Sequence, residues 1–293
     1  MGITVGQSTP DKRQAMKFLK NHISKFYLQN IYERPHKKVR TNLLKKWNEL
    51  KPNQNFYNKM GHHAKHLCDQ GYTIIPVFFK GGVLEDLKSD FERFVSDKEW
   101  DKYKNIQFTR EVLSNSIAFS QAVVDPFLTD LVEYYIGKKI FLAELVGIRS
   151  EGFETPDYGN QMWHHDAKRK QVKVFIYLTE VPPNGQHTDI LPKTHKIWHE
   201  FPQYEDTRYD QDRIKEYFAK YGKPFNLIGP AGTVFIFDTN ALHRGNRNGP
   251  KRDALVFHYT AGRHLYPIPK PHPDALKNYS PKQRGIARLK KYY

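Results

Sequence analysis

Residues 232–262 read GTVFIFDTNALHRGNRNGPKRDALVFHYTAG, and this stretch decides the fold. The run from Thr233 to Asp238 has the pattern of a barrel strand, and residues 253–262 form a second β-rich run. The connection between them contains Asn, Gly and Pro, the residues typical of turns. The stretch therefore predicts two strands of an antiparallel β-structure, with His243 shortly after the first strand and Arg252 at the start of the second.

Short β-rich runs of the same kind fill the chain after Gly137. Turns such as PPNG (182–185) and GPAG (229–232) separate them. This pattern is typical of an antiparallel barrel or sandwich. The remaining runs are KIFLAELVGIR (139–149), NQMWHHD (160–166), VKVFIYLTEV (172–181) and FNLIG (225–229).

The residues before Gly137 favour helices. Apolar residues recur every three or four positions in residues 11–32, which indicates an amphipathic helix. Further helices are expected at 41–50, at 55–70 with Gly71 as the C-cap, at 81–95 and at 126–135, whereas YTIIPVFF (72–79) has the pattern of a strand. We therefore expect three parts: a basic helical N-terminal extension (1–66), a β-rich domain with its helical layer (67–270) and a basic C-terminal tail (271–293).

The composition is that of a globular protein. Hydrophobic residues make up 39% of the chain, which is enough for a core although the mean hydropathy is -0.74. Cys68 is the only cysteine, which excludes an intramolecular disulfide and a thiolate-based zinc site and favours a reducing, cytoplasmic location. No signal peptide and no membrane span is expected, because the chain has no suitable apolar run.

The net charge of +16 is unevenly distributed. Residues 1–60 contain 13 Lys or Arg and three acidic residues (Asp11, Glu33 and Glu49), so this segment supplies 13 − 3 = +10. Such a segment favours contact with nucleic acid, an acidic membrane surface or a charged glycan. A solvated basic face that keeps the protein soluble explains the same charge equally well.

The stretch WHHD (163–166) contains two adjacent histidines and an aspartate. In a strand, successive side chains point to opposite faces, so His164 and Asp166 share one face and His165 points the other way. An imidazole and a carboxylate on one face are two of the three ligands in the two-His-one-carboxylate site of non-haem iron enzymes. His243, which follows a later strand, is the candidate for the third ligand.

Arg252 lies nine residues after His243 and is the candidate for an anion receptor. Its planar guanidinium can bind the far carboxylate of 2-oxoglutarate while the keto acid end chelates iron. Lys168 and Lys170 lie two and four residues after Asp166, and a barrel mouth lined by such cations favours an anionic substrate. A charged turn in solvent is an equally good interpretation of these two lysines.

Together these segments resemble the phytanoyl-CoA dioxygenase family of Fe(II)- and 2-oxoglutarate-dependent oxygenases. The resemblance implies a mainly β fold with flanking helices: a double-stranded β-helix core, that is a jelly roll of the cupin kind, with an N-terminal helical layer. It covers most of residues 67–262. The segments that carry it are GYTIIPVFF (71–79), WHHD (163–166), VFIYLTEVPPNGQHTDILPKTHK (174–196) and HRGNRN (243–248) with Arg252.

The resemblance also implies roles for single residues. His164, Asp166 and His243 become the iron ligands, Arg252 the 2-oxoglutarate clamp and Asn248 a residue that supports the ligands. The loop between His243 and Arg252 is shorter than in the family. Gly245 stands where the family often has a hydroxyl residue that binds the cosubstrate, so Lys173 or Arg149 is expected to donate instead.

The implied activity is oxidation by O2 with 2-oxoglutarate as cosubstrate. Relatives that halogenate lack the carboxylate ligand, so Asp166 favours hydroxylation of an unactivated C–H bond, with desaturation as an alternative. The expected substrate is a small anionic metabolite. Two alternatives remain: the same chemistry on a carrier-, lipid-glycan- or nucleic-acid-linked substrate docked by the basic N-terminal segment, or a non-catalytic basic barrel that binds nucleic acid or protein. No pattern in the sequence sets the oligomeric state.

Overall fold

The computed structural model describes residues 54–96, 98–100, 106–110, 112–152, 159–166, 171–200, 208–246, 248–261 and 268–289. The helices predicted at 11–32 and 41–50 lie outside these residues, and so do Lys168 and Lys170.

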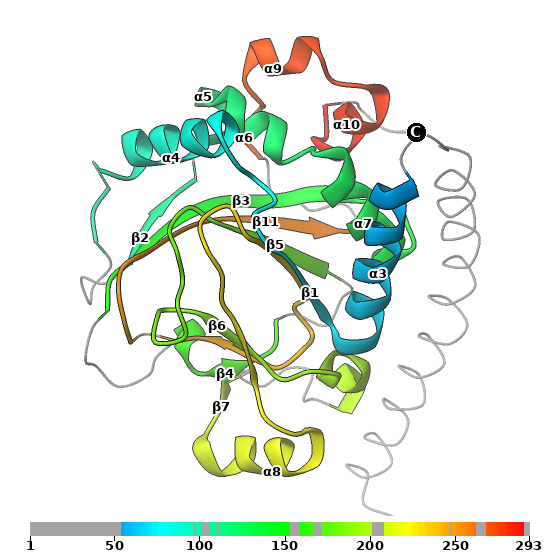
Figure 1. Ribbon diagram of the computed structural model, residues 1–293, viewed down its shortest axis with the longest axis vertical. Helices are drawn as coiled ribbons and strands as arrows, with labels where there is room; N and C mark the ends of the chain where they lie inside the picture. The colour runs from blue at the N-terminus through cyan, green and yellow to red at the C-terminus, as the bar shows by residue number, and fades with distance from the viewer. Residues whose placement is uncertain are drawn as a thin grey trace, which may run out of the picture.

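Two antiparallel sheets form the core of the protein (Figure 1). The larger sheet has the strand order β1-β9-β5-β11-β3-β2, and the smaller sheet has the order β7-β4-β10-β6-β8. Neighbours that are distant in sequence, such as β5 between β9 and β11, are typical of the crossing connections of a jelly roll. The predicted mainly β fold with a jelly-roll core is therefore confirmed.

The strand bounds agree with most of the β-rich runs in the sequence. The larger sheet contains β1 (Tyr72–Ile75), β2 (Ile106–Thr109), β3 (Phe141–Ser150), β5 (Gln171–Tyr177), β9 (Val234–Asp238) and β11 (Arg252–Thr260). The smaller sheet contains β4 (Trp163–His164), β6 (Thr188–Ile190), β7 (Arg208–Tyr209), β8 (Phe225–Leu227) and β10 (His243–Gly245).

Helices cover the outer face of the larger sheet (Figure 1). The predicted helices at 55–70, 81–95 and 126–135 are confirmed as α3 (Gln54–Gln70), α4 (Gly82–Val95) and α7 (Pro126–Ile136). Among the described residues, no helix is long and apolar enough to cross a membrane. The other helices are α5 (Val112–Asn115), α6 (Ile117–Ala122), α8 (Gln211–Tyr221), α9 (Pro273–Lys277) and α10 (Pro281–Ile286), with the 3-10 turns η3 (Gly159–Gln161) and η4 (Thr194–Glu200).

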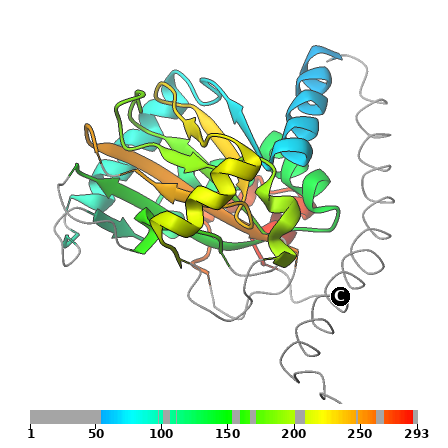
Figure 2. The same cartoon turned by 90° about the horizontal axis from the view of Figure 1, so that it is seen from below.

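α8 packs on the smaller sheet, on the opposite side of the molecule from the helical layer (Figure 1, Figure 2). Ile214 of α8 belongs to one apolar cluster with Trp163 of β4 and Tyr209 of β7. Asp210 caps this helix by accepting a hydrogen bond from the backbone N–H of Arg213. The helix therefore supports the strand that ends in His164.

Gly71 connects α3 to β1, as predicted for a C-cap. Its φ of 88° lies in the left-handed region, which favours glycine. A Cβ atom there would lie 2.5 Å from Nδ1 of His195, so the close approach of this loop also requires glycine. The His195 ring in turn lies against the carbonyl of Cys68, at 3.2 Å from Nε2, and braces this junction.

Alternation along β11 assigns its side chains to two different cores. Leu255 packs with the helical layer, whereas Ala254 and Val256 face the smaller sheet across the barrel interior. By the same alternation Arg252 faces the interior and Asp253 faces the helical layer. The charged side chains of these two adjacent residues thus lie on opposite faces of the sheet.

The C-terminal segment packs against the same helical core. Ala275, Tyr279 and Ile286 are buried in the cluster that also contains Leu131 of α7. At the other end, the predicted division after residue 66 falls inside α3. The predicted three-part division of the chain stays a prediction.

Candidate metal centre

Antiparallel pairing of two short strands brings two histidines together. His164 at the end of β4 lies directly opposite His243 at the start of β10, and their ring centroids are 4.3 Å apart. Asp166 follows two residues later, with Oδ1 3.8 Å from Nε2 of His164. One ligand atom from each of these three residues lies within 4.8 Å of the other two. The three predicted iron ligands therefore converge on one point.

Backbone carbonyls fix which nitrogen each histidine offers. Nδ1 of His164 lies 2.8 Å from the carbonyl of Met162, and Nδ1 of His243 lies 2.8 Å from the carbonyl of Ala241. Each Nδ1–H therefore donates to a carbonyl, and the lone pair on Nε2 remains available to bind a metal. Such outer hydrogen bonds orient metal-binding histidines in proteins.

A tight turn after β9 places His243. The carboxylate of Asp238 accepts a hydrogen bond from the backbone N–H of Asn240 at 2.8 Å, and the carbonyl of Asp238 accepts one from Ala241. Aspartate is typical of such turns because its side chain can accept from the backbone two residues on. In the same turn, the carbonyl of Thr239 accepts a hydrogen bond from the backbone N–H of Asp166 at 2.9 Å. This hydrogen bond joins the segment that carries His164 and Asp166 to the turn that precedes His243.

Burial and local charge keep the three ligands in their metal-binding protonation states. Burial lowers the pKa of His164 well below its usual value, and it lowers the pKa of His243 to about 4. Burial raises the pKa of Asp166, but Lys173 and the two histidines outweigh it, so the pKa lies well below the usual value. At neutral pH the site therefore presents two neutral imidazoles and one carboxylate, the forms that bind a divalent cation.

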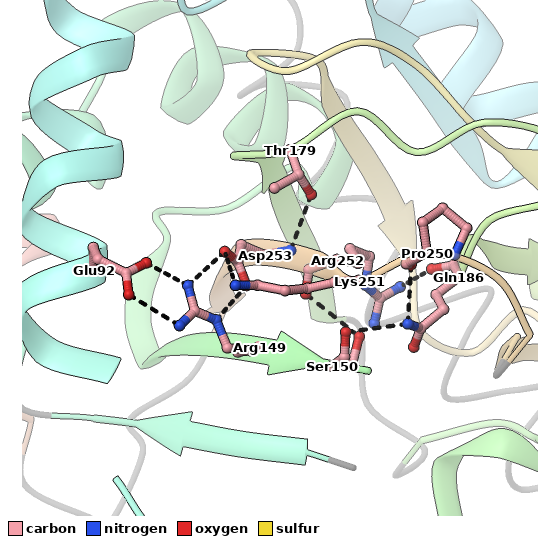
Figure 3. Close-up of polar contacts among 9 residues, drawn as sticks. All are labelled: Glu92, Arg149, Ser150, Thr179, Gln186, Pro250, Lys251, Arg252 and Asp253. Atoms are coloured by element: carbon pink, nitrogen blue, oxygen red, sulfur yellow. Dashed lines mark hydrogen bonds and ion pairs between the residues drawn. The ribbon is translucent and has the colours of Figure 1, made fainter. Parts of the chain in front are cut away.

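Arg252 is a buried cation in the barrel interior. Its Nη1 donates to the backbone carbonyl of Gln186 at 2.6 Å, and its Nε has no hydrogen-bond partner among the described residues (Figure 3). No carboxylate of those residues lies within ion-pair distance of its guanidinium, since Asp253 points to the other face. A buried charge of this kind is costly unless an anion pairs with it. The arrangement fits a receptor for a carboxylate ligand.

Lys173 lies at the metal end of the same interior. Its Nζ is 2.7 Å from Oδ2 of Asp166, and along β5 it shares a face with Phe175 and Tyr177, which line the interior. It was predicted as a cosubstrate donor, and its location beside the ligands is compatible with that role. The ion pair also shows that this carboxylate is held by a counter-charge before any metal binds.

Arg149 was predicted as an alternative donor to the cosubstrate, and its guanidinium lies on the face of the larger sheet that is turned away from the barrel interior. Its guanidinium donates to Asp253 from Nε and Nη2, at 2.9 and 2.8 Å, and to both carboxylate oxygens of Glu92 (Figure 3). All of this lies on the helical side of the larger sheet. The physical reason is the register of β3 with β11, which pairs Arg149 with Asp253 and turns both away from the interior.

Asn248 was predicted to support the iron ligands, and this stays a prediction. Asn248 is exposed, and its backbone N–H lies 3.3 Å from the side-chain oxygen of Asn246. It is Asn246 that faces inward, where its amide donates to the carbonyl of Gly185 at 2.9 Å. The two asparagines differ because Asn246 continues the pairing of β10, whereas Asn248 lies in the loop beyond it. Lys168 and Lys170, predicted for substrate binding, lie outside the described residues.

Residues 67–252, well over half of the chain, match the family described as Phytanoyl-CoA dioxygenase (PhyH). The chain belongs to this family. As a PhyH member it is an Fe(II)- and 2-oxoglutarate-dependent dioxygenase, as its sequence predicted, and the family match together with the complete triad argues against a non-catalytic barrel. Among curated proteins, no sequence matches the chain.

Several solved structures resemble the fold. EctD from S. alaskensis, solved with 2-oxoglutarate and 5-hydroxyectoine, is 18% identical, with a TM-score of 0.57 over 74% of this chain and 86% of EctD. The epimerase SnoN in complex with Fe3+, alpha ketoglutarate and nogalamycin RO is 15% identical, with a TM-score of 0.55 over 76% and 91%. HygX from Streptomyces hygroscopicus with nickel and 2-oxoglutarate is 17% identical, with a TM-score of 0.51 over 70% and 90%.

The residues of this PhyH protein fit the cofactors of its family. Two Nε2 lone pairs and one carboxylate suit ferrous iron, whose facial site leaves positions open for other ligands. Nε of Arg252, which has no hydrogen-bond partner in the part of the chain that the structure describes, suits the far carboxylate of 2-oxoglutarate. His164, Asp166 and His243 would hold the iron, and Arg252 would anchor the cosubstrate.

Acidification is expected to destabilise the metal-free protein between about pH 6.5 and 4. Burial lowers the pKa of His243 from 6.5 to about 4, so in this window the unfolded chain binds a proton that the folded chain excludes. The contribution is fully present above the unfolded pKa and is lost as the pH falls, by on the order of 2–3 kcal/mol. Denaturant unfolding with a chelator present, at a series of pH values, measures it. The variant His243→Asn should show a shallower dependence, and an unchanged slope would contradict the assignment.

The sequence analysis missed the residues that hold Arg252. Gln186 accepts from its guanidinium, and the only local signal was a glutamine after the PPNG turn, which is compatible with an exposed loop. A buried polar group at the start of β6 was missed as well: His187 pairs with Asp189 at 2.6 Å, and Asp189 also accepts from Arg244. The contacts of Arg252 with Gln186 and of Arg244 with Asp189 join segments that are distant in sequence.

Proposed function

We propose that the protein hydroxylates an unactivated C–H bond of a small anionic metabolite. The proposal rests on the cation at the metal end of the barrel: Lys173 lies 2.7 Å from Asp166 on the interior face. A cation beside the reacting position attracts a negatively charged substrate and disfavours a cationic one. The overall charge of +16 acts in the same direction at longer range.

Each residue of the centre has a distinct task. His164, His243 and Asp166 would hold the iron, which would supply, with O2 and 2-oxoglutarate, the oxidising power for the insertion of one oxygen atom into a C–H bond, with succinate and CO2 as the other products. Arg252 anchors the far carboxylate of the cosubstrate. Stacked aromatic side chains exclude water from the interior between the metal ligands and Arg252. The ring centroids of Phe175 and Phe235, for example, are 4.5 Å apart.

Asp166 supports hydroxylation over halogenation. In the family, halogenating members lack this carboxylate, and its absence is what leaves room for a halide. Here the carboxylate is present and its pKa lies well below the usual value, because Lys173 and the histidines stabilise the charged form. It therefore stays ionised and available as a ligand throughout the neutral pH range.

Mass spectrometry of paired metabolites tests the proposal. Each anionic candidate is incubated aerobically with enzyme, Fe(II) and 2-oxoglutarate beside a neutral analogue, such as its ester or amide. We expect the anionic member of each productive pair to be converted to a product with one additional oxygen atom, with matching formation of succinate. The variant Lys173→Met should lose this preference for the anion. A product that lacks two hydrogens would indicate desaturation, and a preference for neutral substrates would overturn the anionic assignment.

A second candidate is a substrate presented on a large anionic carrier, which the +10 charge of residues 1–60 favours. Contact with a lipid-linked glycan, a CoA thioester or nucleic acid would make substrate affinity fall steeply with salt. Shallow salt dependence would favour the free metabolite. Cytoplasmic location and peripheral contact with an anionic membrane stay predictions from the sequence.

A further inference from the structure

The guanidinium of Arg252 is held on one side only. Nη1 donates to the backbone carbonyl of Gln186 at 2.6 Å, whereas Nε is buried without a partner among the described residues. Carboxylates bind arginine through two parallel hydrogen bonds along one edge of the guanidinium. With Nη1 held by Gln186, the edge formed by Nε and Nη2 is the one left for a ligand. The carbonyl of Gln186 therefore determines which way the receptor faces.

The side chain of Gln186 fixes the position of that carbonyl. Its amide Nε2 donates to the carbonyl of Ser150, the last residue of β3, at 3.1 Å and to the carbonyl of Pro250 at 3.0 Å (Figure 3). The residue is 3% exposed, and its hydrogen bond to the buried Ser150 is protected from water. Both amide hydrogens are used, one on each side of the start of β11.

Gln186 therefore joins three segments that are distant in sequence. Its side chain connects the end of β3 to the residues before β11, and its main chain contacts the arginine that opens β11. Removal of the amide would take this donor from the carbonyls of Ser150 and Pro250, and the loss is costly at Ser150 because that residue is buried. The strand ends and the guanidinium would then lose their common point of attachment.

A separate set of contacts holds the same strand from its other face. Asp253 accepts from Arg149, which also donates to Glu92, and the backbone N–H of Asp253 donates to the hydroxyl of Thr179 at 3.0 Å (Figure 3). These contacts lie on the helical side of the sheet and do not touch Arg252. The start of β11 is thus anchored independently of Gln186. A change at Gln186 can therefore alter the orientation of the Arg252 guanidinium while the strand stays folded.

We propose that Gln186 is a positioning residue that aims Arg252 at the far carboxylate of 2-oxoglutarate. The proposal rests on the proposed cosubstrate role of Arg252. If it is correct, loss of Gln186 weakens the binding of ligands that reach Arg252. The affinity for ligands that only chelate the metal stays unchanged. A residue that served folding alone would affect both kinds of ligand.

Calorimetric titration without turnover tests this selectivity. The protein is loaded with Mn(II) under anaerobic conditions and titrated with 2-oxoglutarate and, separately, with 2-oxobutyrate, a 2-oxo acid that lacks the far carboxylate. In Gln186→Ala we expect roughly tenfold weaker binding of 2-oxoglutarate, the usual size of such an outer-contact effect, and unchanged binding of 2-oxobutyrate. Glu92→Gln is the matched control on the outer face and should leave both affinities unchanged.

A double-mutant cycle with Arg252→Met completes the test. If Gln186 acts through Arg252, then Gln186→Ala has no further effect on 2-oxoglutarate binding once Arg252 is absent. Equal weakening of both ligands, or full additivity in the cycle, would overturn the proposal. If Gln186→Ala does not fold, Gln186→Asn, whose amide is one methylene too short to reach both carbonyls, replaces it. Absence of 2-oxoglutarate binding in the unmodified protein would instead overturn the cosubstrate role itself, and this inference with it.

Discussion

Replacing His243 with alanine is expected to abolish iron binding at the centre and, with it, all turnover of 2-oxoglutarate. The imidazole supplies one of three ligands, and Nε2 is the only nitrogen it can offer because Nδ1 is committed to the carbonyl of Ala241. Two remaining ligands from His164 and Asp166 form an incomplete facial site. We expect the turnover of 2-oxoglutarate to fall by on the order of 10³-fold or more, because the whole reaction depends on this ligand.

Asp166→Ala should have the same outcome by a second route. It removes the negative ligand and leaves Lys173 without its partner, so a cation then lies beside a site that must bind a divalent cation. Iron content after anaerobic reconstitution and succinate production are the two measurements. His165→Gln is the matched control, because its ring lies on the opposite face, near Tyr209, and should retain iron. Stoichiometric iron in either ligand variant would show that the metal binds elsewhere.

Two members of the predicted triad are local in sequence, and their common face follows from the sequence alone. Alternation along a strand places His164 and Asp166 on one face wherever that strand lies in the fold. The third member depends on pairing, and the register of β10 with β4 places His243 opposite His164. His243 was predicted because it follows a later strand and because the family resemblance implies it, and strand alternation supplies neither kind of information.

The two arginines show where sequence reasoning ends. Arg149 and Arg252 both lie at the ends of strands, and nothing in their local sequence distinguishes a ligand-binding arginine from a structural one. The register decides: Arg149 lies opposite Asp253, whereas Arg252 lies opposite Ser150, one step along and therefore on the other face. A shift of β3 by one residue would turn Arg149 toward the interior. Such a register is a property of the assembled sheet.

The missed elements have a similar cause. α8 has a clear cap at Asp210 and ends before Gly222, so its signals were present in the sequence, although they were not used. β6, β7 and β10 are only two or three residues long. Strands this short carry no periodic pattern, and they form only because longer strands and α8 hold them in place.

Arg252→Met is expected to weaken 2-oxoglutarate binding and to stabilise the ligand-free protein, and the combination distinguishes a receptor from a structural residue. A charged hydrogen-bond pair contributes about 1.5–3 kcal/mol, so affinity should fall by roughly 10- to 150-fold. In the absence of ligand, however, the guanidinium is a buried charge with no carboxylate partner among the described residues, and burial lowers its pKa. An apolar side chain of similar length removes that cost.

The two measurements are calorimetric titration of the Mn(II)-loaded protein with 2-oxoglutarate and denaturant unfolding of the metal-free protein. Arg149→Met is the matched control: it leaves the carboxylates of Asp253 and Glu92 without their shared partner, so it should destabilise the fold and leave cosubstrate affinity unchanged. If Arg252→Met instead destabilised the ligand-free protein and bound 2-oxoglutarate normally, Arg252 would be the structural arginine and the carboxylate receptor would have to lie elsewhere in the barrel. Opposite effects of the same substitution on β3 and β11 would establish that the register of this strand pair separates the cosubstrate pocket from the scaffold.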